Sequence, residues 1–401
     1  MLAHEEAGMP PPLDFDYETI LDARSFENPA NYALLRITRL RGVSAADCVN
    51  DEKPPVIVDP RAGHGPGIGG FTRDSEVGMA LQEGHATYFV IFFQLPSPNQ
   101  TLTDVLHALH RFVEEVSCRH NGRAPVLYGN CQAGWAVTLL AADCEGLSGA
   151  ITINDSPLSY WAGAADTNPM RLAGGLMGGS WLTHLLADLG KGRLAGAWLV
   201  QNFENLNPAN TLWDKNYNVF AHIDTDCERF LEFDRWWTGY HFLSREEMMS
   251  IVENLFIGNK LERGTLKICE CCYVDLKRIR NPLVIFASSG DNIWPPHQAL
   301  NWIPTVYPTT ADLKNAGQRI IYLLNTYVGH LGIFMSASVA KLEHRAILES
   351  LGELDALKPG LYEIKISNPT GDPGSLKPQY TVQFEEHQVE QIHYAYPEQS
   401  F

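Results

Sequence analysis

The sequence predicts an α/β protein in which a mostly parallel sheet is flanked by helices and carries an inserted, largely helical cap. Three observations lead to this prediction. Short apolar runs bounded by Gly, Pro or Asp alternate with amphipathic segments near both ends of the chain, which is typical of β-α units. The middle of the chain loses this alternation and is rich in tryptophan. Polar residues that could act in catalysis directly follow several of the apolar runs.

The apolar runs have the length of buried strands. The longest, ATYFVIFFQL at 86–95, is about half of the roughly 20 residues that a membrane-spanning helix requires, so no transmembrane segment is expected. Apolar residues recur on one face of 102–116 with a helical period, which predicts a helix covering the sheet. Strands are expected at 54–60, 86–93, 124–130, 149–157, 282–291 and 319–325, and further helices at 134–143 and 336–351.

The alternation also predicts the division of the chain. Residues 30–157 and 279–358 form the expected core, and 158–278 form the cap, which holds six of the nine tryptophans. Residues 1–29 are expected to be an N-terminal extension, and 359–401 a β-rich tail with a hairpin.

Charge and composition exclude several functions. The chain has 401 residues, with 30 Lys+Arg against 47 Asp+Glu and a formal charge of −17, which repels nucleic acid and anionic membranes. The N-terminal residues are acidic and proline-rich where an export signal needs a basic start and an apolar run, so a cytoplasmic location is predicted. Eight cysteines without regular spacing are then expected to be reduced thiols. The group ICECC at 268–272 lacks a Cys-x-x-Cys pair or a nearby His pair, so neither a metal nor another cofactor is expected.

A chemical site is predicted at the turn after the strand 124–130. A strand that turns sharply into a helix presents one side chain at its apex, and small flanking residues keep the turn from clashing. Here the turn reads Gly129, Asn130, Cys131, Gln132, Ala133, with Cys131 in the place of a nucleophile. The start of the helix favours a thiolate there, a nearby imidazole can take the proton, and the backbone N–H of Gln132 is placed to hold an oxyanion.

Two downstream residues follow in the order of an α/β-hydrolase triad. Asp291 ends the run 282–291, directly after PLVIFASSG, and His330 follows the strand 319–325, at the carboxyl ends where α/β sheets build their sites. Asp155 follows the strand after the nucleophile helix and is an alternative to Asp291 as the acid. His64 is the second candidate for the base, although its place after an early strand suits oxyanion or substrate contact better.

The loop 63–70, GHGPGIGG, is glycine-rich but lacks the Gly-Lys-Ser/Thr of a P-loop and meets the dinucleotide spacing only loosely. Its place after an early strand instead predicts the second oxyanion N–H, from Arg61 or Ala62. His64, Trp135, Trp161 and Trp294 are candidates for lining a substrate pocket.

Long motifs carry a resemblance over about 30–362. The runs VDPRAGHGPGIGGF, GNCQAGW, INDSPLSYWAG, GAWLVQNFENLNPANTLWDK, FASSGDNIWPP and GHLGIF resemble a bacterial family labelled poly(3-hydroxyalkanoate) synthetase-like. The pattern is similar, at greater distance, to polyhydroxyalkanoate synthases, whose elbow is Gly-x-Cys-x-Gly and whose acid lies in an Asp-His-Ile-x-Pro motif. Ala133 and Asn292 depart from those patterns. Intracellular depolymerases are also similar, since they too place Gln after the cysteine and carry a Gly-His after an early strand.

The resemblance implies that Cys131 accepts an acyl group, that His330 is the base and that Asp291 orients it. The expected substrates are small or polymeric esters or thioesters of the 3-hydroxyacyl type, including acyl-CoA, with hydrolysis and synthase-like transfer both open. A homodimer is compatible with the sequence. Two other interpretations remain: a non-catalytic protein that binds polymer granules or acts as a scaffold through its aromatic cap, and a redox role for Cys131, which lacks an evident resolving cysteine.

Overall fold

The computed structural model describes residue 6 and residues 8–40, 53–163, 174–268, 273–370 and 379–395. It confirms the predicted fold class, because one ten-stranded sheet runs in the order β1-β2-β4-β3-β5-β6-β9-β10-β11-β12. All neighbours from β4 to β11 are parallel, while β1, β2 and β12 pair antiparallel, and this arrangement is the α/β-hydrolase fold. The strands are β1 (Phe15–Asp22), β2 (Tyr32–Leu40), β3 (Pro55–Val58), β4 (Tyr88–Phe92), β5 (Val126–Asn130), β6 (Ile151–Asn154), β9 (Leu283–Ser288), β10 (Arg319–Asn325), β11 (Gly360–Thr370) and β12 (Gln379–His387).

The central strands are short and apolar because both of their faces are covered. Every residue of β3, β4, β5, β6 and β9 is buried. Strands covered on both faces read as continuous apolar runs rather than as alternating ones. The same burial explains why these strands could be located from the sequence.

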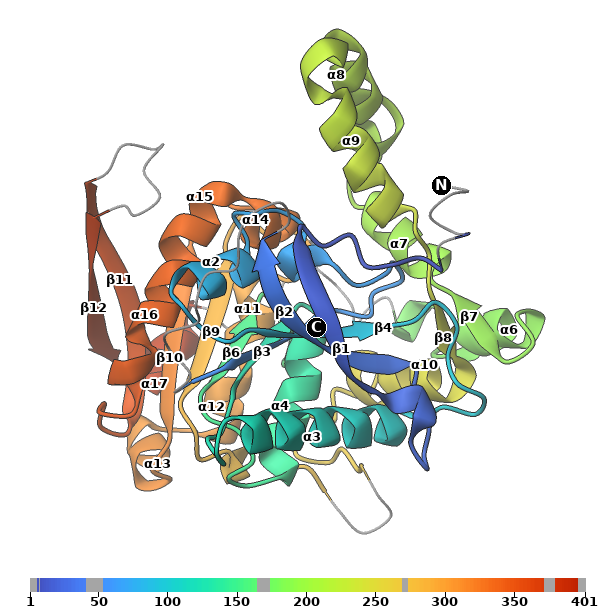
Figure 1. Ribbon diagram of the computed structural model, residues 1–401. Helices are drawn as coiled ribbons and strands as arrows, with labels where there is room; N and C mark the ends of the chain where they lie inside the picture. Colours follow the sequence, from blue (N-terminus) through green and yellow to red (C-terminus); the bar gives the residue numbers. More distant parts are fainter. Residues whose placement is uncertain are drawn as a thin grey trace.

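Helices lie on both faces of the sheet, with α3 and α4 on one and α2, α14 and α16 on the other (Figure 1). The first turn of α3 is fixed by a capping box between Thr101 and Asp104, and its buried residues occupy one face. The helices of the core are α2 (Glu76–Gln82), α3 (Leu102–Arg119), α4 (Ala133–Asp143), α11 (Pro296–Leu300), α12 (Trp302–Val306), α13 (Thr310–Asn315), α14 (His330–Met335), α15 (Ala337–Val339), α16 (Arg345–Leu354) and α17 (Val389–Ala395), with short turns η1 (Ala23–Ser25), η2 (Ile68–Gly70), η5 (Leu276–Arg278) and η6 (Ala340–His344).

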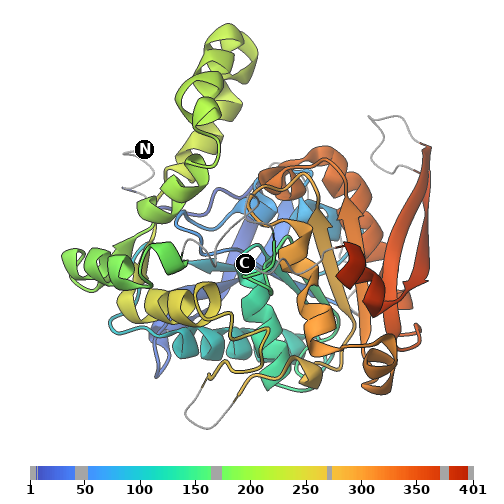
Figure 2. The same cartoon turned by 180° about the vertical axis from the view of Figure 1, so that it is seen from behind.

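Both ends of the chain are more closely joined to the sheet than the sequence indicated. Within the expected extension 1–29, β1 pairs antiparallel with β2 and forms one edge of the main sheet. Within the expected tail, β11 pairs parallel with β10 and β12 forms the opposite edge, as Figure 2 shows. The hairpin is therefore part of the sheet rather than a separate appendage.

The described residues of the segment 158–278, which we call the cap, are mostly helical and also form a small two-stranded sheet. Helices α8 and α9 form an arm that projects away from the main sheet (Figures 1 and 2). Among the described residues, no helix combines the length and apolarity needed to cross a membrane. The cap elements are α6 (Trp181–Leu189), β7 (Arg193–Ala195), α7 (Ala197–Glu204), η3 (Asn210–Asp214), α8 (Lys215–Ala221), α9 (Ile223–Trp237), β8 (Phe242–Ser244), α10 (Arg245–Ile251) and η4 (Val252–Phe256).

Candidate active site

Cys131 lies at the apex of a sharp turn between β5 and α4. Its φ of 49° is in the left-handed region, which costs free energy for a residue other than glycine and is common at functional turns. The turn is held because the backbone N–H of Cys131 donates to the carbonyl of Asn154 at 2.8 Å and that of Gly134 donates to the carbonyl of Cys131 at 3.0 Å. Cys131 thus occupies a left-handed turn that joins a strand directly to a helix.

Two glycines allow the strand and the helix of this turn to approach each other. A Cβ on Gly129 would lie 2.6 Å from the Cα of Gly134, and a Cβ on Gly134 would lie 2.3 Å from the Oγ of Ser156. Position 134 therefore excludes a side chain, while position 133, where the elbow pattern has glycine, accepts alanine. Gly134 therefore supplies, one residue later, the glycine that the elbow pattern places at position 133.

His330 contacts two carboxylates at once. Its Nδ1 lies 2.7 Å from Oδ2 of Asp155 and 2.7 Å from Oδ2 of Asp291. Asp291 follows β9, and its other oxygen accepts the backbone N–H groups of Ile293 at 2.6 Å and Trp294 at 3.1 Å. The two acids that the sequence offered as alternatives both reach the histidine, from neighbouring strands.

The charges of these three side chains are coupled. Burial and the adjacent carboxylate of Asp291 raise the pKa of Asp155 well above its ordinary value. Burial alone would raise the pKa of Asp291, but the imidazole of His330 and the hydrogen bond from Asp155 lower it overall. Burial opposes a charge on His330, yet the charges of Asp291 and Cys131 and the hydrogen bond to Asp155 raise its pKa well above the ordinary value. Of the two carboxyl groups, Asp291 is therefore the one whose charged form its surroundings favour.

The ligand-type atoms of Asp155, Asp291 and His330 lie within 4.8 Å of one another, close enough to hold a metal ion. Nδ1 of His330 already contacts one oxygen of each carboxylate at hydrogen-bond distance, while Oδ1 of Asp155 is buried without a hydrogen-bond partner among the described residues. Glu363, Glu385 and His387 form a second such group on the β11–β12 hairpin. Of the cysteine group at 268–272, the thiols at 269, 271 and 272 lie outside the described residues.

The thiol of Cys131 is covered by an indole ring. Trp294 Nε1 donates to Cys131 Sγ at 3.2 Å, and only 3% of Cys131 is exposed. The edge of Tyr160 meets the Trp294 ring at 5.8 Å between centroids. Because the loop that carries Asp291 also carries Trp294, one turn after β9 supplies both an acid for the histidine and a contact for the thiol.

The expected oxyanion residues border a common pocket beside the thiol. Gln132, Arg61 and Ala62 all line it. Neither the backbone N–H of Gln132 nor that of Ala62 donates to an acceptor within the described part of the chain. The Gln132 side chain instead accepts from the indole of Trp135 at 2.9 Å and from the hydroxyl of Tyr160 at 3.1 Å.

The Arg61 side chain joins the core to the cap. It forms a buried ion pair with Glu247 of α10, with 3.1 Å between Nη1 and Oε1. It also donates to Oδ1 of Asn31 at 2.8 Å and to the carbonyl of Phe242 at 2.7 Å. These bonds hold the loop after β3 against the cap.

The glycine-rich loop packs against protein rather than forming an open anion cradle. The backbone N–H of Gly65 donates to the carbonyl of Gly239 at 3.0 Å. Those of Gly67 and Gly69 donate to the carboxylate of Asp59 at 2.6 and 3.2 Å. Gly63, with φ of 112°, has no room for a Cβ against the backbone of the cap. These glycines allow the loop backbone to approach neighbouring backbone closely. The N–H groups of Gly65, Gly67 and Gly69 already donate to protein acceptors, so they do not form a phosphate cradle.

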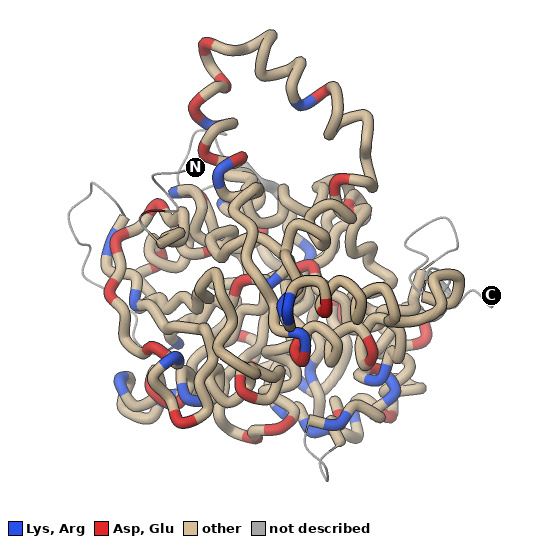
Figure 3. The backbone as a smooth tube through the Cα atoms, turned by 90° about the vertical axis from the view of Figure 1, so that its right-hand side faces the viewer, with Lys and Arg blue, Asp and Glu red and all other residues tan. Residues whose placement is uncertain are grey.

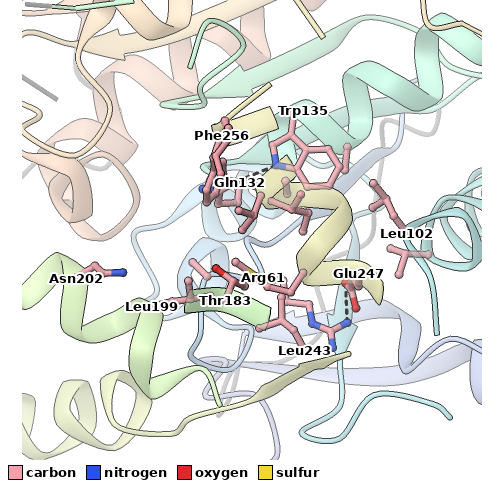
Figure 4. Close-up of a pocket in the computed structure, with 18 of the residues that line it drawn as sticks. Arg61, Leu102, Gln132, Trp135, Thr183, Leu199, Asn202, Leu243, Glu247 and Phe256 are labelled. Carbon is pink, nitrogen blue, oxygen red and sulfur yellow. Dashed lines mark hydrogen bonds and ion pairs between the residues drawn. The ribbon is translucent and has the colours of Figure 1, made fainter. Parts of the chain in front are cut away.

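The pocket lies between the core and the cap and has a volume of about 560 Å³. Figure 4 shows Gln132 and Trp135 on one side and Leu199, Asn202 and Leu243 from the cap on another. Of the four residues suggested as pocket-lining, Trp135 and Trp294 line this pocket, whereas His64 and Trp161 are not among its lining residues.

The latter two predicted pocket residues have other surroundings. His64 is buried against Trp236, with 4.1 Å between ring centroids, and burial lowers its pKa to about 4. The indole of Trp161 donates to the carbonyl of Phe256 at 3.2 Å and lies beneath Arg263. His64 therefore stays neutral inside the core–cap contact.

A buried polar network, not predicted from the sequence, lies beneath the site. It joins Glu76 of α2 to Asn130 and Asn154, the residues just before Cys131 and Asp155. The available signal was the repeated placement of asparagine at the end of two buried strands.

Comparisons with known proteins add the following findings. A family model described as "Protein of unknown function (DUF3141)" matches residues 1–400. A Rhizobium meliloti protein, described as an uncharacterized protein in the ackA 5′ region, is 49% identical over 373 residues, which are 92% of this chain and 50% of the relative. The chain therefore spans about half the length of the curated relative that it matches.

Solved structures with similar folds include a monoacylglycerol lipase of Paleococcus ferrophilus, at 15% identity and a TM-score of 0.45, covering 75% of this chain and 94% of that one. A carboxylesterase structure from Nitrososphaera gargenis has 13% identity and a TM-score of 0.48, covering 85% and 99%. A thermophilic esterase of Thermogutta terrifontis has 9% identity and a TM-score of 0.44, covering 84% and 99%.

Proposed function

The chain belongs to the DUF3141 family, and we propose that it is an acyl-transfer enzyme that cleaves esters or thioesters through an acyl-cysteine. One observation carries this proposal. The fold has both a thiol at a left-handed turn, Cys131, and a histidine, His330, whose Nδ1 lies 2.7 Å from an oxygen of each of two buried carboxyl groups. The charge of Cys131 contributes to the raised pKa of His330, which supports their pairing.

In the proposed first step, Cys131 Sγ attacks the carbonyl carbon of the substrate while His330 holds the thiol proton. Asp291 stabilises the imidazolium, and the backbone N–H groups of Gln132 and Ala62, or Arg61, hold the oxyanion. Collapse of the tetrahedral intermediate breaks the C–O or C–S bond, and the leaving group takes the proton from His330. The acyl group then remains on Cys131 as a thioester.

In the proposed second step, the acyl-cysteine passes its acyl group to an acceptor. Water, deprotonated by His330, gives a free acid and regenerates the thiol, as in an esterase, thioesterase or depolymerase. The hydroxyl of another hydroxyacyl group gives chain extension, as in a synthase. The resemblance to polyhydroxyalkanoate enzymes favours 3-hydroxyacyl esters, polymeric esters or acyl-CoA as substrates, in a cytoplasmic location.

The pocket supports an acyl substrate. Its walls are mostly apolar, and it reaches the indole that contacts the thiol. Thr183 and Asn202 place polar groups among the apolar side chains, where they would suit an acyl chain that bears a hydroxyl (Figure 4).

The decisive experiment is intact-mass analysis after mixing the protein with p-nitrophenyl butyrate or, separately, 3-hydroxybutyryl-CoA. We expect a transient mass increase equal to one acyl group in the wild type and none in Cys131→Ala. Cys118→Ala, which removes an exposed free thiol, is the matched control and should form the adduct normally. The donor that acylates Cys131, and the release or extension of the acyl group, separates hydrolase from synthase.

Absence of an adduct and of turnover with both donors would count against the catalytic proposal. Retention of turnover in Cys131→Ala would exclude the acyl-cysteine mechanism specifically. Reversible loss of Cys131 labelling by iodoacetamide after peroxide treatment, without turnover, would support the redox interpretation instead.

A second candidate function is binding to an apolar polymer surface, as a granule-bound or scaffold protein. The arm α8–α9 and the preceding segment η3 carry large apolar side chains that are 53–77% exposed. These side chains are Leu212, Trp213, Tyr217, Phe220 and Ile223.

Co-sedimentation with poly(3-hydroxybutyrate) particles tests this second function. The double variant Trp213→Ser with Phe220→Ser should release the protein from the particles, while Leu95→Ser, on the core, should not. Equal binding by all three proteins would exclude the arm as the contact. Sedimentation without particles would show whether the arm joins two copies as a homodimer.

A further inference from the structure

Glu76 lies beneath the candidate site and is fully enclosed. It is the first residue of α2, after the N-cap Ser75, and only 2% of it is exposed. Its two carboxyl oxygens accept from two asparagines: Oε2 from Asn130 Nδ2 and Oε1 from Asn154 Nδ2, both at 2.6 Å. One side chain thus bridges two adjacent strands.

The two asparagines precede the two left-handed turns of the site. Asn130 and Asn154 are register partners in the parallel pair β5–β6. The residues that follow them, Cys131 and Asp155, both have φ of 49°. Asn154 also donates to Asn130 Oδ1 at 3.1 Å, and its carbonyl accepts the backbone N–H of Cys131. Any change in the spacing of the asparagines therefore moves the thiol relative to the acid that contacts His330.

The same network reaches the loop that holds the other oxyanion candidates. Asp59, at the end of β3, accepts from Asn130 Nδ2 at 3.3 Å and from the backbone N–H groups of Gly67 and Gly69. A Cβ on Gly69 would lie within 3.0 Å of Asn130, Asp59 and Glu76, so the loop packs directly on the network. The ends of β3, β5 and β6 and the loop that contains Gly67 and Gly69 are thus joined through the carboxyl groups of Asp59 and Glu76.

We infer that Glu76 is a positioning residue that sets the distance between the nucleophile turn at Cys131 and the acid turn at Asp155. This inference rests on the proposed function, because it concerns the geometry that the acyl-transfer step would need. Glu76 does not touch the thiol or the histidine, and it acts through the amides of Asn130 and Asn154.

The surroundings of Glu76 define the variants that test it. His344 Nε2 donates to the carbonyl of Ile333 at 2.7 Å, so its Nδ1, 3.6 Å from Glu76 Oε1, carries no proton. Burial raises the pKa of Glu76 to about 8. Glutamine keeps the volume but has an amide NH₂ in place of one of the two acceptor oxygens, so one asparagine loses its acceptor. Alanine removes both acceptors.

The test compares Glu76→Gln and Glu76→Ala with Glu262→Gln. Glu262 is a matched buried acid: its oxygens accept from Asn259 Nδ2 at 2.6 Å and Thr305 Oγ1 at 2.8 Å, and neither of these residues is hydrogen-bonded to Asn130 or Asn154. Three quantities are measured at pH 7: the rate of iodoacetamide labelling of Cys131 by peptide mass, kcat and KM with p-nitrophenyl butyrate, and the thermal midpoint.

We expect Glu76→Gln to lower the labelling rate and kcat roughly 5- to 20-fold with KM nearly unchanged, since small misplacements of reacting groups cost rate rather than binding. Glu76→Ala should lower them further. Glu262→Gln should alter the thermal midpoint alone. If Glu76→Ala does not fold, Asn154→Ala removes one of the two bonds from the other side and should lower the labelling rate and kcat as Glu76→Gln does.

A lowered thermal midpoint in Glu76→Gln, with labelling rate and kcat within twofold of the wild type, would overturn the inference and leave Glu76 as a structural acid. Failure of the proposed function has a different signature, namely turnover that survives Cys131→Ala or is absent in the wild type. The labelling rate does not require turnover, so it tests Glu76 in either case.

Discussion

The Nδ1 atom of His330 faces two carboxyl groups at the same distance, yet the two have opposite tendencies to ionise. Burial and the neighbouring Asp291 raise the pKa of Asp155, while the imidazole of His330 and the hydrogen bond from Asp155 lower the pKa of Asp291. Only a charged carboxylate stabilises an imidazolium fully. We therefore assign the orienting role in the proposed reaction to Asp291 and a supporting role to Asp155.

This assignment predicts unequal effects of two isosteric variants. Asp291→Asn removes the charge beside His330 and should lower kcat/KM roughly 10²- to 10⁴-fold, as loss of a triad acid does. Asp155→Asn preserves a neutral donor and should cost less than about tenfold, since a single hydrogen bond contributes about 1 kcal/mol. Steady-state kinetics with p-nitrophenyl butyrate at pH 7 measure both. A larger loss in Asp155→Asn would reverse the two roles.

The lowered pKa of Asp291 also determines how activity that depends on its charge should respond to pH. Its charge is present above the folded pKa and is lost as pH falls through that value, which lies below 3.8. Activity that depends on Asp291 should therefore persist across mildly acidic pH in the wild type.

At the scale of elements, the ion pair between Arg61 and Glu247 connects the loop after β3 to α10 of the cap. Both side chains are buried, with 6% and 2% of each exposed. Removing one partner of a buried pair leaves an uncompensated charge, whereas replacing both by apolar groups of similar volume is often neutral.

Glu247→Leu should accordingly destabilise the protein by about 3–5 kcal/mol. The double variant Arg61→Met with Glu247→Leu should recover most of that free energy of unfolding, measured by urea denaturation. The same double variant should retain acylation of Cys131 if Arg61 acts only through its backbone. Additive losses in the double variant would show that the two side chains do not depend on each other.

The core elements were predictable where burial makes the sequence distinctive. The strands 124–130, 282–291 and 319–325 correspond to β5, β9 and β10, because apolar runs between turn residues have few other structures. The strand β1 was not predicted, since an edge strand with exposed residues at Glu18 and Thr19 lacks such a run. Pairing of β11 with β10 was missed because strand order joins distant segments.

The site was predictable in its parts but not in its assembly. Cys131 and His330 follow strand ends, which the sequence displays. That β6 and β9 are neighbours, and so bring Asp155 and Asp291 to one nitrogen, depends on a crossover beyond the entire cap. Glu76 was missed because an acid at a helix start is usually exposed, and nothing local marks it as buried.

At the scale of the whole molecule, acidic and basic residues are interspersed along the chain (Figure 3), and a few titratable groups lie fully inside. Burial raises the pKa of Glu76 to about 8 from its ordinary 4.5. The folded protein then keeps a proton that the unfolded chain releases. The stability associated with it is complete below pH 4.5 and is lost as pH rises through about 8.

Glu76→Gln should therefore lose less stability than the wild type on going from pH 6 to pH 8. As pH rises, the free energy of unfolding of the variant minus that of the wild type should increase by about 1.4 kcal/mol per pH unit. Urea denaturation at pH 6, 7 and 8 measures it, with Glu262→Gln as the control. Parallel curves for Glu76→Gln and the wild type would show that the buried acid does not titrate in this range.

The cap is inserted between β6 and β9, so the residues of the candidate site are spread widely along the chain. His330 lies 199 positions after Cys131. At a synthesis rate of about 5–20 residues per second, the thiol leaves the ribosome roughly 10–40 s before its histidine. A growing polypeptide thus carries Cys131 for that interval without the histidine that acts as its base in the proposed mechanism. The order of the strands delays reactivity until nearly the whole described fold has been made.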